Sequence, residues 1–426
     1  MKINVIGGGL AGSEASYFLA KLGLKVTLYD QKPILGEAFS SPKFGELVCS
    51  NSLKSEDPLS ASGMLKSELK EMGSLILESA YKAKLPSGQD LAVDRDIFSS
   101  YIDEKIRSSP NIKVMSEKIE KLERGEDVIN IICTGPLTEK GLMDELSSII
   151  GGNFLSFYDA AAPLLVFSSL DTSRMYEKSR YDKGEGKYLN IPLTQTEYLD
   201  FTEALSQAER AVLHDFDHFE GCLPVEVMAQ RGIDTLRFGP LKPRGLETET
   251  IRPYAVVQLR KDDVAGDLFG MVGFQTNLTY QEQKRVFSML PGLENVRFSR
   301  YGLMHRNSYL NAPLTINRDM SLKSDRNIFI GGQLSGVEGY MESACSGLLA
   351  AYYVYQRINN MPFREVPLTT MIGSLINYLV MSSPKNFQPI NACYGILQGY
   401  SKKEKEAIYN KSKEDISLWV RQNFLR

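Results

Sequence analysis

The sequence predicts an α/β protein whose parallel sheet draws strands from both ends of the chain, with an inserted α+β domain between them. Three observations lead to this fold class. A strand, a glycine-rich loop, a helix and a second strand follow one another within the first 30 residues, the length of a βαβ unit. A further apolar strand runs into glycines near residue 330. The middle of the chain changes to polar turns, a helix and short strands, as expected of a separate domain.

The first βαβ unit joins a strand over residues 2–6 to a strand over residues 25–30. Both segments are short and apolar. The helix between them is predicted over residues 13–22, because apolar side chains recur there at helical spacing up to Gly23. These elements predict a Rossmann-like start to the domain.

The loop between the first strand and the helix matches the pattern G-x-G-x-x-G. Its first glycine permits a tight turn, its second lets the backbone approach a pyrophosphate, and its third lets the helix pack on the strand with its N-terminus toward the phosphates. Asp30 ends the second strand and can accept a hydrogen bond from a ribose hydroxyl. The unit therefore predicts dinucleotide binding, without distinguishing FAD from NAD, by Gly7, Gly8, Gly9, Leu10, Ala11, Gly12 and Asp30.

Two later segments favour FAD. Residues 128–136 form a buried-strand pattern that ends in Thr-Gly, as in flavoproteins where a strand passes the dinucleotide. Residues 327–333 form another strand, followed by a turn and a small-residue helix over residues 343–349 whose N-terminus can face a flavin ring or a phosphate. The predicted FAD-binding domain is discontinuous, over residues 1–164 and 298–426, and its further contacts are Thr134, Gly135, Gly331, Gly332, Gln333, Gly336, Val337, Glu338 and Tyr340.

The insertion spans residues 165–297, with a helix expected over residues 197–209 and strands over residues 254–259 and 270–274. Eleven Lys and Arg stand against seven Asp and Glu between residues 237 and 306, although the whole chain carries a net charge of −3. This local excess predicts either a surface that faces a polyanion or an ordinary solvated face.

Composition excludes several classes of protein. Hydrophobic residues make up 43% and charged residues 24% of the 426 residues, which excludes collagenous, coiled-coil and largely disordered chains. No secretory signal is recognisable at the start, and no apolar stretch reaches the roughly 20 residues of a membrane span, so we expect a cytoplasmic protein without membrane contact. An odd number of cysteines, five, without Cys-x-x-Cys, predicts free thiols, and only three histidines argue against a metal site.

Two cysteines stand in turns that could expose a reactive thiol. Cys49 follows a short apolar run and precedes a polar Ser-Asn-Ser turn. Cys222 lies two residues before Pro224, on a turn that we expect to open a helix, where the helix N-terminus would lower the thiol pKa. A small buried hydrophobic side chain is the alternative for each, and it is the expectation for Cys133 and Cys345.

Many ordered segments over essentially the whole chain resemble the folate- and FAD-dependent tRNA uracil-5-methyltransferases, the GidA-related TrmFO family. The segments that carry the resemblance are residues 7–14 (GGGLAGSE), 46–52 (ELVCSNS), 91–95 (LAVDR), 134–138 (TGPLT), 158–163 (YDAAAP), 179–184 (SRYDKG), 220–222 (EGC), 252–260 (RPYAVVQLR), 272–276 (VGFQT), 301–307 (YGLMHRN), 336–343 (GVEGYMES) and 385–389 (KNFQP).

The resemblance implies methylation of C5 of a T-loop uridine in tRNA. The methylene group of 5,10-methylenetetrahydrofolate would pass through reduced FAD to the uracil, with NADH or NADPH as the reductant. By motif, Cys222 is the nucleophile that adds to uracil C6. Cys49 would help to remove the C5 proton or protect the site, and His305, Arg306 and Asn307 would hold the folate.

Three alternatives stay open at the level of the sequence. A paralogue that methylates 23S ribosomal RNA would share this chemistry, although the presence of both cysteine motifs favours tRNA. A non-catalytic RNA-binding flavoprotein would not require Cys222. An ordinary NAD(P)H oxidoreductase would require neither the basic insertion nor the paired cysteines. One departure from many flavoproteins is Gln333, which follows Gly332 where a Gly-Asp pair is common.

Overall fold

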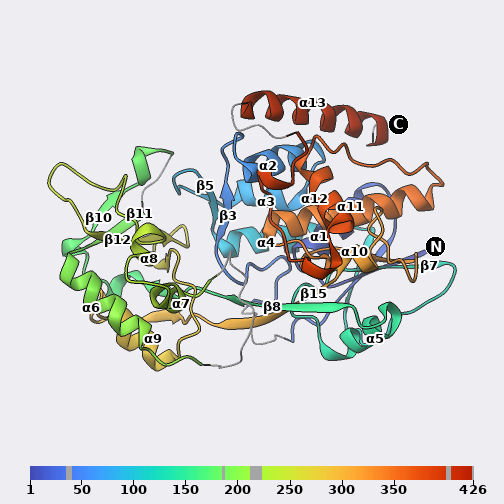
Figure 1. Cartoon of the computed structure of the whole chain (residues 1–426). Coiled ribbons are helices and arrows are strands. Elements are labelled where there is room, and N and C mark those ends of the chain that lie inside the picture. The colour runs from blue at the N-terminus through green and yellow to red at the C-terminus, as the bar shows by residue number, and fades with distance from the viewer. Residues whose placement is uncertain (35–40, 185–187, 212–222, 400–403, 425–426) are drawn as a thin grey trace.

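The structure is a computed structural model that describes residues 1–34, 41–184, 188–211, 223–399 and 404–424. Figure 1 shows two bodies, each built around its own sheet and joined by extended strands. Both ends of the chain belong to the larger body. The smaller body contains the middle of the chain.

The larger body is built on a parallel sheet of five strands among the described residues, in the order β16-β7-β1-β2-β6. The last of these strands in sequence, β16, pairs with β7, with Ile330 opposite Ile132. This pairing confirms the prediction of a sheet assembled from both ends of the chain. The strands are β1 (Lys2–Ile6), β2 (Val26–Asp30), β6 (Ile112–Ser116), β7 (Val128–Ile132) and β16 (Ile328–Ile330).

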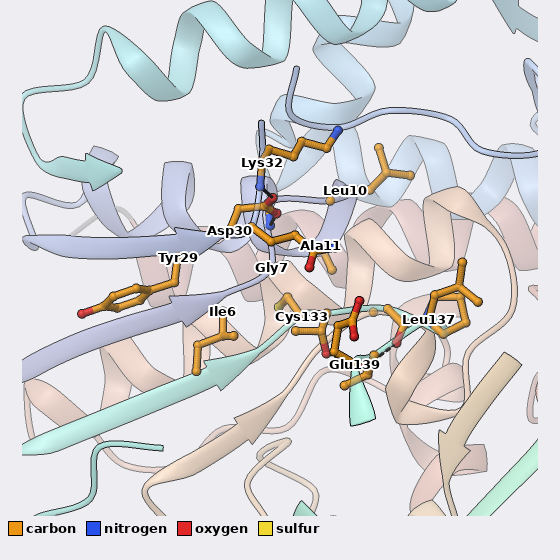
Figure 2. A pocket seen from close by; sticks show the side chains of 18 of the residues that line it. Ile6, Gly7, Leu10, Ala11, Tyr29, Asp30, Lys32, Cys133, Leu137 and Glu139 are labelled. Atoms are coloured by element: carbon orange, nitrogen blue, oxygen red, sulfur yellow. Dashed lines mark hydrogen bonds between the residues drawn. The ribbon is translucent and has the colours of Figure 1, made fainter. Parts of the chain in front are cut away.

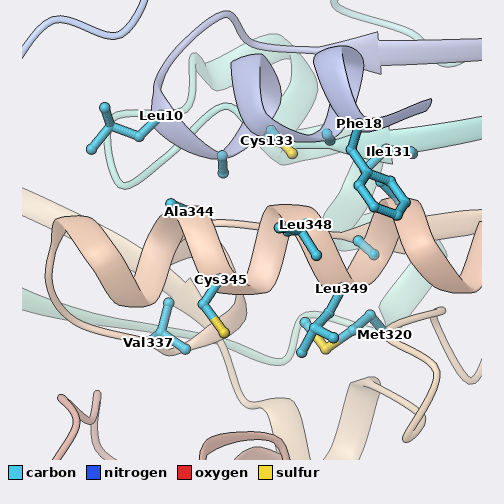
Figure 3. Close-up of a cluster of buried hydrophobic side chains, with 14 of the residues drawn as sticks. Leu10, Phe18, Ile131, Cys133, Met320, Val337, Ala344, Cys345, Leu348 and Leu349 are labelled. Carbon is cyan, nitrogen blue, oxygen red and sulfur yellow. The ribbon is translucent and has the colours of Figure 1, made fainter. Parts of the chain in front are cut away.

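Helices α1 (Leu10–Lys21) and α11 (Tyr340–Ile358) pack closely against each other beside this sheet (Figure 3). A methyl group at Gly347 would lie 2.3 Å from the carbonyl oxygen of Ala11, so the two backbones approach at this point. Both helices begin three residues before the starts predicted from sequence, and α11 continues nine residues past its predicted end at residue 349, because its second half is buried in the core.

A small antiparallel sheet and further helices complete the larger body. The sheet has the order β3-β5-β4. Its strands are β3 (Ser52–Ser55), β4 (Lys84–Leu85) and β5 (Asp90–Val93), and the helices are α2 (Ala61–Glu71), α3 (Leu75–Lys82), α4 (Arg95–Arg107), α5 (Lys140–Ile150), α10 (Ala312–Thr315), α12 (Met371–Met381) and α13 (Lys405–Phe424).

Two buried glutamates tie these helices together. Glu14 of α1 accepts hydrogen bonds from the backbone N–H groups of Leu75 and Ile76 at the start of α3, at 2.8 and 2.9 Å. Glu68 of α2 accepts equivalent bonds from the first residues of α12 and a hydroxyl bond from Ser412 of α13. Each carboxyl therefore caps the N-terminus of a neighbouring helix, and burial raises the pKa of both to about 7.

The smaller body is an antiparallel sheet in the order β10-β11-β12-β13-β9-β14 with its own hydrophobic core. Its strands are β9 (Leu164–Val166), β10 (Tyr176–Lys178), β11 (Tyr188–Leu193), β12 (Ala255–Lys261), β13 (Leu268–Met271) and β14 (Phe298–Arg300), and its helices are α6 (Gln195–Ser206), α7 (Val225–Gln230), α8 (Thr235–Phe238) and α9 (Tyr280–Phe287). The strand predicted over residues 270–274 is shifted: β13 ends at Met271, because the chain turns at Gly273, where φ is +78°.

A long antiparallel ribbon connects the two bodies. It consists of β8 (Phe154–Ala160) and β15 (Met304–Leu310), whose registers place Met304 opposite Ala160 and Leu310 opposite Phe154. Figure 1 shows this ribbon running from the larger body toward the smaller one. The segments by which the chain enters and leaves the smaller body therefore lie side by side.

Candidate functional site

A cavity of about 190 Å³ lies over the glycine-rich loop, next to the ends of β1, β2 and β7 (Figure 2). We call it the glycine-loop cavity. Segments from the start, the first third and the last third of the chain line it, as the sequence predicts for one cofactor held by both chain ends. The predicted cofactor residues in its lining are Gly7, Gly8, Gly9, Leu10, Ala11, Asp30, Thr134, Gly135, Gly332, Gln333 and Tyr340.

The start of α1 is suited to an anionic ligand. Gly9 is the N-cap of the helix and offers no side-chain cap to the first-turn N–H groups. A methyl group at Gly9 would meet no atom within 4 Å, whereas one at Gly12 would lie 1.7 Å from the carbonyl oxygen of Gly7. Gly12 therefore packs the helix on the strand, and Gly9 leaves room for a phosphate against the backbone, so this cradle fits the pyrophosphate of FAD.

The Asp30 carboxylate is held in a fixed orientation at the edge of this cavity. One of its oxygens accepts a hydrogen bond from the N–H of Gly8 at 2.5 Å, and the other accepts one from the N–H of Lys32 at 2.8 Å. These bonds link the glycine-rich loop to the end of β2. Asp30 therefore stands where the sequence pattern puts the acid of a dinucleotide site.

Some of the predicted cofactor residues lie away from this cavity. Gly331 packs against Cys133, where a methyl group would lie 2.9 Å from Sγ. Gly336 packs against the Phe387 ring, and Val337 is buried beside Cys345 in the core (Figure 3). These three residues and Gly12 therefore pack against neighbouring segments and do not line the cavity.

Cys133 and Cys345 are buried thiols, as predicted. Burial raises the pKa of Cys133 to about 12 and raises that of Cys345 well above its ordinary value. Neither supplies a thiolate near neutral pH.

A second cavity of about 370 Å³ adjoins the first, and Cys49 stands in its wall. We call it the Cys49 cavity. It lies between the two bodies, because its lining includes residues of β12, β13 and the glycine-containing segment that opens α11. Among the predicted site residues, Cys49, Asn307, Gln333, Glu338 and Tyr340 line it.

The carbonyl oxygen of Cys49 accepts hydrogen bonds from two arginines. Arg95 Nη2 donates to it at 2.6 Å, and Arg300 Nη2 donates at 2.9 Å. The Cys49 N–H donates to the Tyr340 hydroxyl at 2.9 Å, and Cys49 Sγ lies 3.9 Å from the carbonyl oxygen of Ala160. The backbone of Cys49 is therefore fixed from both bodies.

These two arginines differ in their electrostatic environment. Arg95 Nε donates to Asp262 at 2.8 Å, and that carboxylate is nearly buried. Burial lowers the pKa of Arg95, but Asp262, Tyr340 and Cys49 more than offset this, so its pKa lies above the ordinary value. Burial and the nearby charge of Arg95 lower the pKa of Arg300. Two guanidinium groups thus surround Cys49 with positive charge.

Part of the predicted basic surface points inward. Arg260 Nε donates to Asn51 Oδ1 at 2.9 Å, and its Nη2 donates to Ser50 Oγ at 2.6 Å. Arg260 and Arg300 both belong to the basic excess between residues 237 and 306. They hold the Cys49 segment instead of facing solvent, so that excess overstates the charge at the surface. Arg95 and Asp262 were not anticipated as site residues at all, since no local spacing connects them with Cys49.

The other predicted residues are described only in part. Cys222 lies outside the described residues, but its described neighbours are anchored: the N–H of Ala211 donates to Asn277 O, and the N–H of Val225 donates to Gln275 O, each at 2.7 Å. His305 and Arg306 belong to β15, and their side chains are outside the described part. Asn307, the residue after Arg306, is buried in the wall of the Cys49 cavity.

The described residues contain no group of three or more His, Cys, Asp or Glu that could hold a metal ion. None of the helices in the described part of the chain is both long and apolar enough to span a bilayer.

The parallel sheet, the glycine-rich loop and the uncapped helix start define a dinucleotide-binding protein of the Rossmann-like flavoprotein class. The family model for glucose inhibited division protein A (GidA) matches residues 2–362. Two crystal structures of Aquifex aeolicus GidA have the same fold, with TM-scores of 0.75 and 0.74 at 16% identity; they cover this chain completely, and the chain covers 74% and 76% of theirs.

More similar sequences narrow this assignment. The methylenetetrahydrofolate--tRNA-(uracil-5-)-methyltransferase TrmFO of Streptococcus pneumoniae, strains Hungary19A-6 and D39, is 47% identical over 429 residues. The match covers 97% of this chain and 96% of the relative. The chain therefore belongs to the GidA-related TrmFO family, which confirms the resemblance seen in the sequence.

Proposed function

We propose that this protein methylates C5 of a T-loop uridine in tRNA, with 5,10-methylenetetrahydrofolate as the carbon donor, FAD as the cofactor and NADH or NADPH as the reductant. The activity for which its relatives are named supports the donor and the substrate class. The structural observation that carries the proposal is that the glycine-loop cavity and the Cys49 cavity adjoin. They share the lining residues Val48, Pro136, Leu137, Gln333, Tyr340 and Ser343.

The glycine-loop cavity is the proposed FAD site. The first-turn N–H groups of α1 would bind the diphosphate, and Asp30 would accept a hydrogen bond from the ribose. Gln333 lines both this cavity and the Cys49 cavity. Its side-chain amide, which replaces the aspartate common at this position in flavoproteins, donates a hydrogen bond to the Glu338 carboxylate. When bound, FAD supplies the redox chemistry of the methylene transfer.

The two cysteines would act on the uracil. The Cys222 thiolate adds to C6, which forms a C–S bond and moves an electron pair to C5, the carbon that then attacks the one-carbon unit. Removal of the C5 proton then leaves the electrons of the C5–H bond to re-form the C5–C6 double bond, and the Cys222 thiolate departs from C6 with the electrons of the C–S bond. Cys49 is the proposed base, because its backbone is fixed in the cavity wall by Arg95 and Arg300, and the two guanidinium groups interact electrostatically with its side chain.

The folate would lie in the Cys49 cavity. Asn307 lines this cavity and would offer its amide to the pterin. His305 would provide a flat face for stacking, and Arg306 would pair with a carboxylate of the glutamate tail.

A covalent-trapping experiment tests the role of Cys222. A T-loop hairpin that carries 5-fluorouracil has no C5 proton to lose, so the adduct with the thiolate persists and migrates as a protein–RNA band in a denaturing gel. We expect the band with wild type, with Cys49→Ala and with the control Cys393→Ala, and no band with Cys222→Ala. Adduct formation by Cys222→Ala would contradict the assignment of the nucleophile. A band that forms only with a 23S ribosomal RNA fragment would indicate the paralogue that methylates ribosomal RNA.

A further inference from the structure

Three aromatic rings form a continuous stack on the smaller body. Phe298 and Tyr301 have ring centroids 4.7 Å apart with planes inclined by 20°, and Tyr301 and Tyr280 have centroids 4.8 Å apart with planes inclined by 21°. Phe298 and Tyr301 are partly buried, whereas 54% of Tyr280 is exposed. This aromatic stack therefore ends in an open ring at the surface.

Each ring belongs to a well-anchored segment. Phe298 lies in β14, opposite Leu165 of β9, and packs on the core of the smaller body. Tyr301 precedes Gly302, whose N–H donates to the buried Gln283 amide at 2.7 Å and whose carbonyl accepts from the same amide at 2.9 Å. Tyr280 is the first residue of α9. The rings are thus positioned by the fold before any ligand binds.

The segments that carry the aromatic stack also contribute to the proposed active site. Arg300, two residues after Phe298, reaches the carbonyl oxygen of Cys49 with its guanidinium group. On the other side of Tyr301, the carbonyl of Leu303 accepts a hydrogen bond from the N–H of Ala161, which lines the Cys49 cavity. The backbone just before Tyr280, at residues 275–277, also anchors both described ends of the segment that contains Cys222. In Figure 1, α9 lies at the lower edge of the smaller body.

The chemistry of this surface matches an unpaired nucleotide. A flat, electron-rich ring at the end of a rigid stack presents a face on which any nucleobase can stack. Lys284 stands one helical turn after Tyr280, is exposed, and forms no ion pair within the described part of the chain, so its ammonium group is available to a phosphate on the same face of α9.

We propose that an unpaired nucleobase of the RNA substrate stacks on Tyr280 while the target uridine occupies the Cys49 cavity. This inference rests on the proposed function, because it identifies how the same RNA is held. Stacking beside the cavity would fix the loop after the target base has left its own stack.

Fluorescence anisotropy with two labelled RNAs tests the proposal. One is a T-loop hairpin, and the other is a blunt duplex of the same stem without unpaired bases. The FAD-loaded variants are Tyr280→Leu, Tyr280→Trp and, as a matched control, Tyr81→Leu, which changes a tyrosine of α3 that is 45% exposed. We expect Tyr280→Leu to raise the Kd for the hairpin about tenfold and to leave the Kd for the duplex unchanged.

Two further readouts separate stacking from charge and folding. The slope of log Kd against log salt stays at the wild-type value in Tyr280→Leu, because no cation is removed. Tyr280→Trp retains hairpin affinity because its ring can still stack, and Tyr81→Leu binds both RNAs as wild type does. All variants keep the FAD content of wild type, because neither Tyr280 nor Tyr81 lines the glycine-loop cavity or the Cys49 cavity.

The proposal is overturned if Tyr280→Leu binds the hairpin as tightly as wild type while wild type binds it specifically, a result that leaves the proposed function intact. Equal loss for hairpin and duplex, or failure of Tyr280→Trp to retain affinity, also overturns it. If wild type itself does not bind the hairpin, both this inference and the proposed function fail. If Tyr280→Leu keeps its RNA affinity but loses self-association in sedimentation velocity, the stack would instead be a contact between copies of the chain.

Discussion

Replacing Gly9 with alanine should weaken FAD binding without unfolding the protein. The added methyl group meets no atom within 4 Å, and the backbone at φ −70° and ψ −164° is one that alanine adopts readily. The expected cost in the free energy of unfolding is below about 1 kcal/mol, the difference between glycine and alanine at a helix N-cap. The methyl group nevertheless occupies the space in which a pyrophosphate must approach the backbone.

Gly12→Ala provides the contrast three residues further. Its methyl group would lie 1.7 Å from the carbonyl oxygen of Gly7, which belongs to the backbone against which α1 packs. Because no side chain can move to relieve this contact, we expect a loss of about 3 kcal/mol or more in the free energy of unfolding. Gly12→Ala should therefore lose both stability and FAD binding, whereas Gly9→Ala weakens FAD binding alone.

The assay titrates each apoprotein with FAD by flavin fluorescence and follows unfolding separately by circular dichroism. Losing one hydrogen bond to the charged diphosphate costs about 1.5–3 kcal/mol, so Gly9→Ala should weaken FAD binding by at least about tenfold. Gly125→Ala is the matched control, because its methyl group meets only Val128 Cγ2, at an ordinary 3.6 Å. Wild-type FAD affinity in Gly9→Ala, or unfolding as severe as in Gly12→Ala, would refute this reasoning.

Three further predictions concern the thiols, the buried ion pair and the buried glutamates. Iodoacetamide at pH 8 should modify Cys49 while Cys133 stays unmodified in the folded protein, because burial raises the Cys133 pKa to about 12; peptide mass spectrometry that finds equal labelling would contradict this. Arg95→Met should lower the free energy of unfolding by about 3–5 kcal/mol, because it leaves the Asp262 carboxylate buried without its cation. Adding Asp262→Asn should recover part of this loss, and no recovery in the double variant would argue against a stabilising ion pair. Burial raises the Glu68 pKa from 4.5 to about 7, so the folded state holds this proton more tightly than the unfolded state; the resulting stabilisation is complete below pH 4.5 and is lost as the pH rises to about 7. The difference in unfolding free energy between wild type and Glu68→Gln should therefore fall by roughly 3 kcal/mol over this range, and a difference that is constant with pH would contradict the raised pKa.

The sequence predicted the elements whose signals are local. The glycine-rich loop, Asp30 and the strand before Thr134 follow from spacings of a few residues, and all lie where the pattern requires. The sheet drawn from both chain ends was also predictable, because its first strand, β1, and its last strand in sequence, β16, each run directly into glycines.

The contacts around Cys49 could not be predicted in this way. Arg95 and Asp262 are 167 residues apart, and Arg300 and Cys49 are 251 residues apart, so only the packing of the two bodies brings them together. The same packing explains why Arg260 faces inward although its neighbours suggested a basic surface. Gly336 and Val337 were predicted to contact the cofactor because they follow the last strand of the sheet. Gly336 instead packs against Phe387, and Val337 is buried in the core.

Methyl transfer measured directly tests the central claim. The FAD-loaded protein would be given 5,10-methylenetetrahydrofolate with a labelled methylene carbon, NADPH, and T-loop tRNA and 23S ribosomal RNA fragments side by side. We predict label in 5-methyluridine of the tRNA fragment with wild type and none with Cys222→Ala. Absence of label from both RNAs with FAD bound, or undiminished label with Cys222→Ala, would contradict the account.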